Sequence, residues 1–164
     1  MKNHSWQITA ACSVVFIAVL AVAAYWDPTI RVLHVFESLP YFAAAVLCLR
    51  HNKFGYALGV VSGAFWLWMA GFLTNFVSNG FERLLMLIRT GTVDRFDILI
   101  AVPAAIAAGG LILFSFVGYS RLTKSRSDIL LFLAALVIVP TFFILIFAAF
   151  APQYLGMFDR LLKR

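Results

Sequence analysis

Five long apolar runs, separated by short polar stretches, form the main pattern along this chain of 164 residues. Each run approaches or exceeds the ~20 residues that an α-helix needs to cross the hydrocarbon core of a bilayer. Backbone groups inside lipid must bond to one another, and a helix achieves this within a single segment. The pattern predicts an all-α, polytopic membrane helical bundle. It forms one transmembrane domain over residues 1–164, with five spans at about 7–25, 30–49, 54–76, 96–119 and 128–150.

Two further segments have apolar and basic positions at helical spacing but are too short and too polar to span. The first is GFERLLMLIR, residues 80–89, and the second is the tail YLGMFDRLLKR after Pro152. Short amphipathic helices of this kind lie in the head-group layer of a membrane. We therefore expect interfacial helices near 80–90 and 153–164, with docking onto a partner subunit as the alternative.

The first run also has features of a secretory signal. Lys2 precedes the apolar stretch, and an Ala-x-Ala sequence occurs near Ala23. Cleavage there would leave four spans. We expect the segment to remain as the first of five helices.

The composition adds one point, since it indicates that lipid and not water surrounds most of the protein. The chain is 63% hydrophobic and 12% charged, with a mean hydropathy of +0.97. A soluble domain is about half apolar and about a quarter charged, so the lipid bilayer is expected to surround most of this surface. The net charge of +6 then indicates contact with anionic lipid head groups, and no nucleic-acid partner is expected.

Five spans place alternate loops on opposite faces of the membrane. Face A holds the N-terminus, the 50–53 loop and the 119–127 loop, whereas face B holds the 26–28 turn, the 77–95 connection and the C-terminal tail. Lys and Arg number six on face A and seven on face B, so the positive-inside rule does not decide the orientation. The basic loops of face A are short and almost free of acids, and we expect this face to be cytoplasmic. The expected location is the inner (plasma) membrane of a bacterium.

Small residues recur at intervals of four in the third and fourth runs. This spacing places them on one helix face, where they let a second helix approach closely. We expect the third and fourth spans to pack through them, with a homo-oligomer contact as the alternative. The predicted packing residues are Gly55, Gly59, Gly63 and Gly71 in the third run, and Ala101, Ala105 and Gly109 in the fourth.

The stretch LHVFESLPYF, residues 33–42, carries ionisable residues inside the second run. On a helix, His34, Glu37 and Tyr41 share one face. An unpaired carboxylate at this depth costs a few kcal/mol, so Glu37 is expected to be paired, protonated or in a polar recess. Pro40 removes a backbone donor at the same place, which favours a small polar cavity.

Topology extends this polar face into a layer near face B, because the second and fourth spans begin there and the third ends there. The layer is either a satisfied network that fixes helix register or a site that handles an ion, a proton or a small ligand. Trp26, Asp27 and Arg31 are expected to cap it. The candidate ligand- or ion-handling residues are His34, Glu37, Tyr41, Asn75, Asn79, Arg95 and Asp97.

More specific chemistry is not indicated. Cys12 and Cys48 form no CxxC, and the histidines do not form a zinc or haem pair at one depth. No GxSxG and no phosphate-binding glycine loop occurs. We therefore predict no catalytic residue, no metal and no cofactor.

Three functions remain open at this point. The preferred one is an accessory or structural subunit that packs against other membrane subunits or against itself, because the spans hold few ionisable groups. The alternative is a small oligomeric transporter or channel that uses the layer around His34 and Glu37. The third is a membrane enzyme acting on a lipid-like substrate, which requires a cleft shared by His34 and Asp97.

Overall fold

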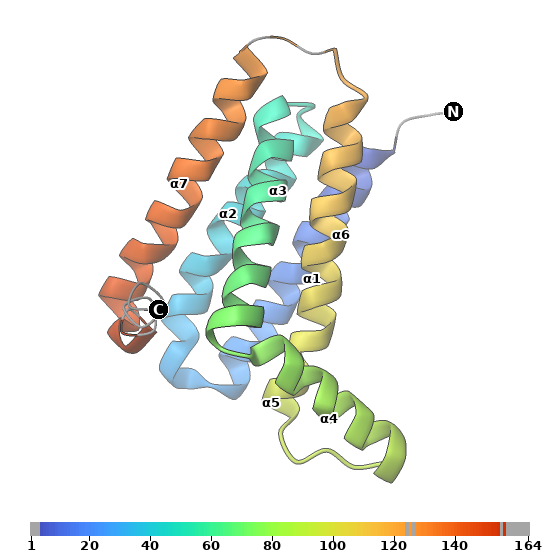
Figure 1. The fold of residues 1–164 in the computed structure, drawn as a ribbon, viewed down its shortest axis with the longest axis vertical. Coiled ribbons are helices and arrows are strands. Elements are labelled where there is room, and N and C mark those ends of the chain that lie inside the picture. The colour runs from blue at the N-terminus through green and yellow to red at the C-terminus, as the bar shows by residue number, and fades with distance from the viewer. Residues whose placement is uncertain (1–3, 124, 126, 155, 157–164) are drawn as a thin grey trace.

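The computed structural model describes residues 4–123, 125, 127–154 and 156, and over this part the chain is helical (Figure 1). Among the described residues, five helices are long and apolar enough to cross a membrane: Ser5–Trp26, Pro28–Leu49, Lys53–Leu73, Phe96–Ser120 and Ser127–Phe150. The predicted fold class and the five spans are confirmed. The elements are α1 (Ser5–Trp26), η1 (Pro28–Ile30), α2 (Arg31–Leu49), α3 (Lys53–Trp68), η2 (Met69–Leu73), α4 (Phe76–Thr90), α5 (Phe96–Leu99), α6 (Ala101–Ser120), α7 (Ser127–Phe150) and η3 (Pro152–Tyr154).

Four spans pack around a common core, and the fifth lies on its outside. α1 contacts α2 and α6, and α3 contacts the same two helices, while α7 packs against α3 and α2. In Figure 1 the α2–α3 turn and the α6–α7 loop lie at the same end, which is face A, whereas α4 and α5 lie at the other end, face B. The alternation of faces expected for five spans is therefore present.

The contact between α3 and α6 depends on glycine. A Cβ added at Gly59 would collide with the Ser115 side chain, and one added at Gly63 would lie 2.9 Å from the backbone oxygen of Ala108. Gly55 instead allows the C-terminal end of α2 to approach, since a Cβ there would lie 2.7 Å from the backbone nitrogen of Cys48. Small residues thus bring the third span close to both neighbours, as in other membrane bundles.

The predicted packing face does not continue along its full length. A Cβ at Gly71 or at Gly109 would meet nothing within 4 Å, so the structure assigns neither residue a close helix contact. Ala101 is fully buried but lies against α4, because a Cβ at Gly80 would be 2.8 Å from its methyl group. Ala105 is partly buried against the core.

The third span ends earlier than predicted, in a π-helix and a corner. Residues 69–73 form η2, and the amide of Thr74 donates to the Met69 carbonyl five residues back, at 3.1 Å. Asn75 then adopts a left-handed conformation with φ of 52°, which asparagine tolerates better than most residues. The prediction that the span continues to residue 76 is therefore wrong, because the chain turns at Asn75 and α4 begins at Phe76.

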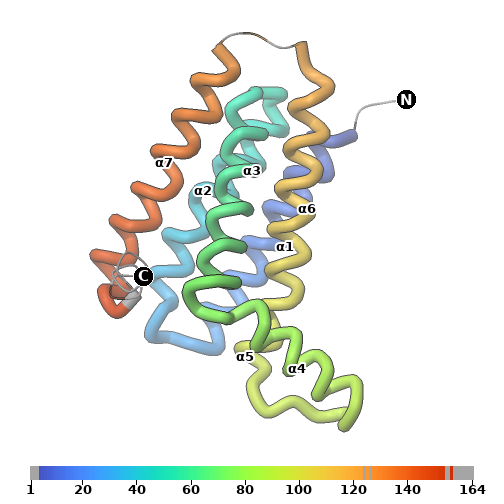
Figure 2. Tube along the Cα trace, in the orientation of Figure 1, coloured from blue at the N-terminus to red at the C-terminus, as the bar shows by residue number. Residues whose placement is uncertain are grey.

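The predicted interfacial helix near 80–90 is present as the longer α4. Of its residues only Gly80 is buried, and Figure 2 shows α4 and the loop that follows it extending beyond the ends of the spans. Phe81, Leu85 and Ile88 form an exposed apolar stripe at helical spacing. Apart from η3 and Gly156, the predicted C-terminal helix near 153–164 lies outside the described residues.

Face A is held together by an ion pair between distant segments. The Lys53 ammonium lies 2.9 and 3.0 Å from the two carboxylate oxygens of Asp128 and donates to the Thr123 carbonyl at 2.5 Å. The amide of Ser125 donates to the same carboxylate at 2.8 Å. The start of α3 is thereby tied to the α6–α7 loop and to the first turn of α7.

Candidate functional site: a cavity at face B

A cavity of about 450 Å³ opens between the helices near face B. Its lining comes from all five spans together with α4 and α5. The mouth is marked by Arg95 and Asp97, whose side chains are 58% and 38% exposed. This volume falls within the ~300–1,000 Å³ that is usual for small-molecule sites. The predicted site residues that line it are His34, Glu37, Asn79, Arg95 and Asp97.

His34 and Glu37 form a buried pair on the wall contributed by α2. Nδ1 of His34 lies 2.6 Å from Oε2 of Glu37, and the glutamate is only 6% exposed. A carboxylate only accepts hydrogen bonds, so Nδ1 of His34 is the donor when Glu37 carries its charge. α2 sets this geometry because residues three apart lie on the same helix face.

The second carboxylate oxygen of Glu37 carries no hydrogen bond. In the part of the chain that the structure describes, Oε1 accepts from no protein donor. Oε1 is not completely enclosed by protein, and Glu37 lines the cavity. A buried polar group without a partner is costly, so this oxygen is available to whatever occupies the cavity.

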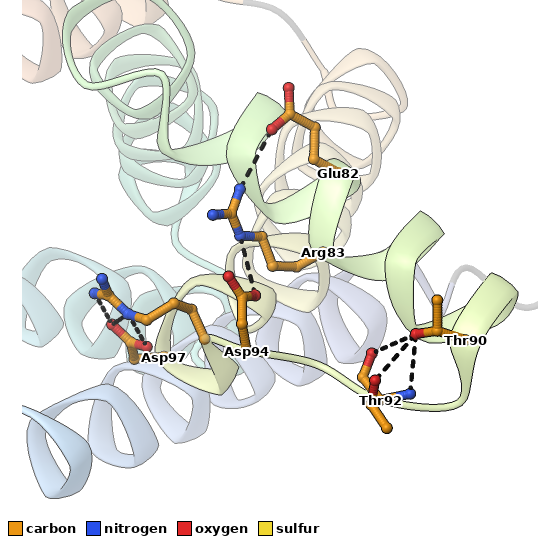
Figure 3. Close-up of polar contacts among 7 residues, drawn as sticks. Glu82, Arg83, Thr90, Thr92, Asp94 and Asp97 are labelled. Carbon is orange, nitrogen blue, oxygen red and sulfur yellow. Dashed lines mark hydrogen bonds and ion pairs between the residues drawn. The ribbon is translucent and has the colours of Figure 1, made fainter.

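The hairpin from α4 to α5 builds the charged mouth (Figure 3). α4 ends at Gly91, which has a φ of +71°. The loop after it is joined to α4 by an ion pair between Nε of Arg83 and Oδ1 of Asp94, 3.5 Å apart. Arg95 then donates to Asp97 through Nε at 2.9 Å and through Nη2 at 2.6 Å. This two-pronged pair raises the pKa of Arg95, chiefly through the hydrogen bond to Asp97.

Asp27 contributes a further carboxylate from the turn between α1 and η1. Its Oδ1 accepts from the hydroxyl of Thr29 at 2.5 Å and from the amide of Thr29 at 3.0 Å. The hydroxyl bond first, and the amide bond second, hold the pKa of Asp27 below its usual range. Asp27 is therefore ionised at neutral pH beside the cavity that it helps to line.

The inner end of the cavity, toward face A, is apolar. Leu20, Trp66, Met69 and Ala104 line this end, whereas Phe147, another apolar lining residue, lies three residues before the face-B end of α7 at Phe150. Beyond it, the Phe16 ring lies 4.1 Å from the Tyr41 ring and 5.0 Å from the Trp66 ring, measured between centroids. Phe16 and Tyr41 are both fully buried. The cavity thus combines charged side chains at its mouth with apolar side chains deeper in, and the rings of Phe16, Tyr41 and Trp66 lie on its face-A side.

Two predicted site residues lie elsewhere. Tyr41 is buried beyond the inner end and donates its hydroxyl to the Ser62 carbonyl at 3.2 Å. Asn75 is exposed at the corner between η2 and α4. Of the expected capping residues, Asp27 lines the cavity, Trp26 packs against Phe96 with 5.5 Å between centroids, and Arg31 donates to the Ala24 carbonyl at 3.1 Å.

Sequence reasoning missed the apolar half of the site. The one available signal is Trp66, which stands near the middle of the third span and away from the membrane interface where tryptophan is usual. Phe147 lies in a uniformly apolar run with no mark to distinguish it. Thr74 also lines the cavity, and its hydroxyl donates to the carbonyls of η2 at 3.4 Å.

The chemistry available to this arrangement is limited. Among the described residues, no group of three His, Cys, Asp or Glu side chains has metal-binding geometry. Within the same residues, His34 bonds to Glu37 and to no serine, threonine or cysteine, so no activated nucleophile is present. The arrangement suits the binding of a molecule with a charged part and an apolar part.

Fold and site together define a multi-pass helical membrane protein with a cavity lined by both charged and apolar side chains. Comparison with known proteins finds no matching family model, no matching curated protein and no matching solved structure.

Proposed function

We propose that this chain is a small carrier-type membrane protein that binds an amphiphilic small molecule in the face-B cavity. The observation that carries the proposal is the buried His34–Glu37 pair on the wall of a 450 Å³ cavity, with Oε1 of Glu37 left without a protein partner. A network that served only to fix helix register would use that oxygen. Ionisable groups at membrane depth commonly belong to ligand or proton pathways.

The packed rings at the inner end favour a carrier over a channel. The rings of Phe16, Tyr41 and Trp66 lie on the face-A side of the cavity, whereas a channel requires a continuous polar path. The π-helix η2 interrupts the third span, and Pro40 removes one backbone donor inside α2; both helices line the cavity. Interrupted helices are a recurring feature of transporter binding sites.

The two other functions are less well supported by the site. An accessory subunit has no need of a ligand-sized cavity, and this role stays a prediction that purification with partner subunits would test. An enzyme acting on a lipid-like substrate requires His34 and Asp97 in one cleft. Both residues line the cavity, but each is already paired, His34 with Glu37 and Asp97 with Arg95.

The binding proposal is tested on the full chain in lipid nanodiscs. The probe is 1-octanol, a neutral amphiphile, and the readout is the rise in the midpoint temperature of unfolding on adding it. Occupancy of the folded state raises stability by RT ln(1 + [L]/Kd). We expect a saturable rise for the wild-type chain that is lost in Ala104→Trp, which fills the inner end. Pro103→Trp, next in sequence but exposed to lipid, is the matched control.

A rise that is identical in the wild type and in Ala104→Trp would mean that octanol acts on the lipid or elsewhere on the protein, and the cavity proposal would be abandoned. Planar-bilayer recording separates the two transport modes. We expect no stepwise conductance, because these rings pack on the face-A side of the cavity. Unitary current steps would show that the protein conducts as a channel, and the carrier proposal would be abandoned.

A further inference from the structure

The charges that face the cavity are predominantly negative. Asp27, Glu37 and Asp97 contribute three carboxylates, whereas Arg95 contributes one guanidinium and His34 at most one further positive charge. The balance therefore stays negative whether His34 is neutral or protonated. Within a membrane this excess is weakly screened and attracts a counter-ion of opposite sign.

The single arginine among the lining residues is already paired with a carboxylate. Its Nε and Nη2 atoms both donate to Asp97, at 2.9 and 2.6 Å. An anion that met the remaining N–H groups of Arg95 would lie close to the Asp97 carboxylate, in a cavity that Glu37 and Asp27 also line. A carboxylate- or phosphate-headed amphiphile is therefore a poor match for this cavity.

The open oxygen of Glu37 specifies the complementary group. Oε1 is an acceptor only, lies on a residue that is 6% exposed, and has no protein donor among the described residues. A cation, or a protonated amine that donates a hydrogen bond, satisfies this oxygen and offsets the excess charge. At the same time the ligand's apolar body can contact the apolar lining residues Leu20, Met69 and Phe147.

Trp66 adds a second feature that suits a cation, since this aromatic residue lines the same cavity as Glu37. The faces of aromatic rings attract ammonium groups. We infer that the natural ligand of the cavity is an amphiphilic cation, namely an ammonium or other monovalent cationic group attached to a hydrocarbon body. This inference rests on the proposed function, because it names the ligand class of the same site.

The test compares three probes with the same hydrocarbon chain and different charge: octyltrimethylammonium, 1-octanol and octyl sulfate. Each is titrated calorimetrically into nanodiscs of phosphatidylcholine that contain the full chain, and empty nanodiscs give the partitioning background. We expect the cation to bind at least about tenfold more tightly than the alcohol, and octyl sulfate to bind no more tightly than it does to empty discs.

Two matched variants locate the effect. Glu37→Gln removes the charge but keeps an oxygen that accepts from His34, so it should weaken cation binding about tenfold or more and leave octanol binding unchanged. Glu82→Gln makes the same substitution on the exposed surface of α4, where the side chain is 69% exposed, and should change neither.

The outcomes separate this inference from the proposed function. If octanol or octyl sulfate binds as tightly as the cation and Ala104→Trp abolishes binding, the cavity is a ligand site but not a cation site. If none of the three probes binds, both proposals fail. If the cation binds equally well to the wild type and to Glu37→Gln, while both keep the same unfolding temperature, the assignment to Glu37 is overturned.

Discussion

Gly63→Ala tests the close contact between α3 and α6 most directly. The added methyl group would lie 2.9 Å from the Ala108 carbonyl oxygen and 2.9 Å from Cγ1 of Ile112. The first of these neighbours is backbone, and the second is held near its own main chain. Neither can move aside without shifting a helix, so the substitution overpacks the contact.

The magnitude follows from two opposing effects. Overpacking a well-filled core costs about 1–3 kcal/mol, and replacing glycine by alanine inside a helix returns up to about 1 kcal/mol. Gly109→Ala provides the matched control, because it adds the same methyl group to a mid-span glycine with nothing within 4 Å. The helix contribution cancels between the two variants, which leaves Gly63→Ala less stable than Gly109→Ala by about 2 kcal/mol.

The assay is thermal unfolding of both variants in the same detergent, followed by circular dichroism. For a chain of this length, about 2 kcal/mol corresponds to about 4–8 °C in the midpoint temperature. We expect Gly109→Ala to match or slightly exceed the wild type, and Gly63→Ala to fall below it by several degrees. Equal midpoints for the two variants would refute the close contact between the helices.

Three other predictions concern the ends of the bundle. His51 holds a left-handed conformation with φ of 57°, so His51→Gly should be more stable than His51→Ala by about 1 kcal/mol in chemical denaturation, since both lose the ring and only alanine keeps the strain. Lys53→Met leaves the buried Asp128 carboxylate without its ammonium partner, and we expect a lower unfolding temperature that Asp128→Asn partly restores in the double variant. Thr29→Val removes the hydroxyl bond that chiefly lowers the pKa of Asp27. Carboxyl NMR should therefore show a higher pKa for Asp27 in the variant. A lowered carboxyl pKa stabilises the fold above the ordinary pKa of ~3.9, and this stabilisation is lost as the pH falls through the folded pKa, so the variant should lack it.

The spans were predictable because their signal is strong. A run of some 20 apolar residues has few alternatives to a membrane helix, and the loop alternation follows from the number of spans. The pairing of the third and fourth spans also followed from Gly59 and Gly63. The early end of the third span was not predictable, since Phe76 and Val77 continue the apolar run after Thr74 and Asn75. The π-turn there depends on tertiary packing that local composition does not encode.

The polar half of the site could also be predicted from the sequence. Charged residues in a membrane segment are few, and topology brings His34, Glu37, Arg95 and Asp97 to one depth. Their pairing could not be read from the sequence, because Arg95 bonds to its near neighbour Asp97 and not across to Glu37. The clamp of Lys53 on Asp128 was also missed, although both residues begin spans on face A.

The apolar half of the site is harder to predict in principle. Leucine, methionine and phenylalanine line this cavity and also fill every helix contact around it. The small polar residues Ser5, Thr9 and Ser13 of α1 are likewise buried in helix contacts, at intervals of four, and do not line the cavity. A cavity is a property of how several helices fail to fill the space between them, so no single segment records it.

The π-helix η2 acts as a spacer in the third span. Residues before it are fixed by the approach of Gly59 and Gly63 to α6, and residues after it by the corner at Asn75. The wider turn accommodates one residue more than an α-helical path would need between these two fixed points. Deleting a single residue from 69–73 would remove this extra residue and let the segment form a regular α-helix between the same two points, whereas inserting one would turn the residues downstream by about 100° around the helix axis. Insertions and deletions in this short segment are therefore expected to reshape the cavity wall while leaving the number and order of the spans unchanged.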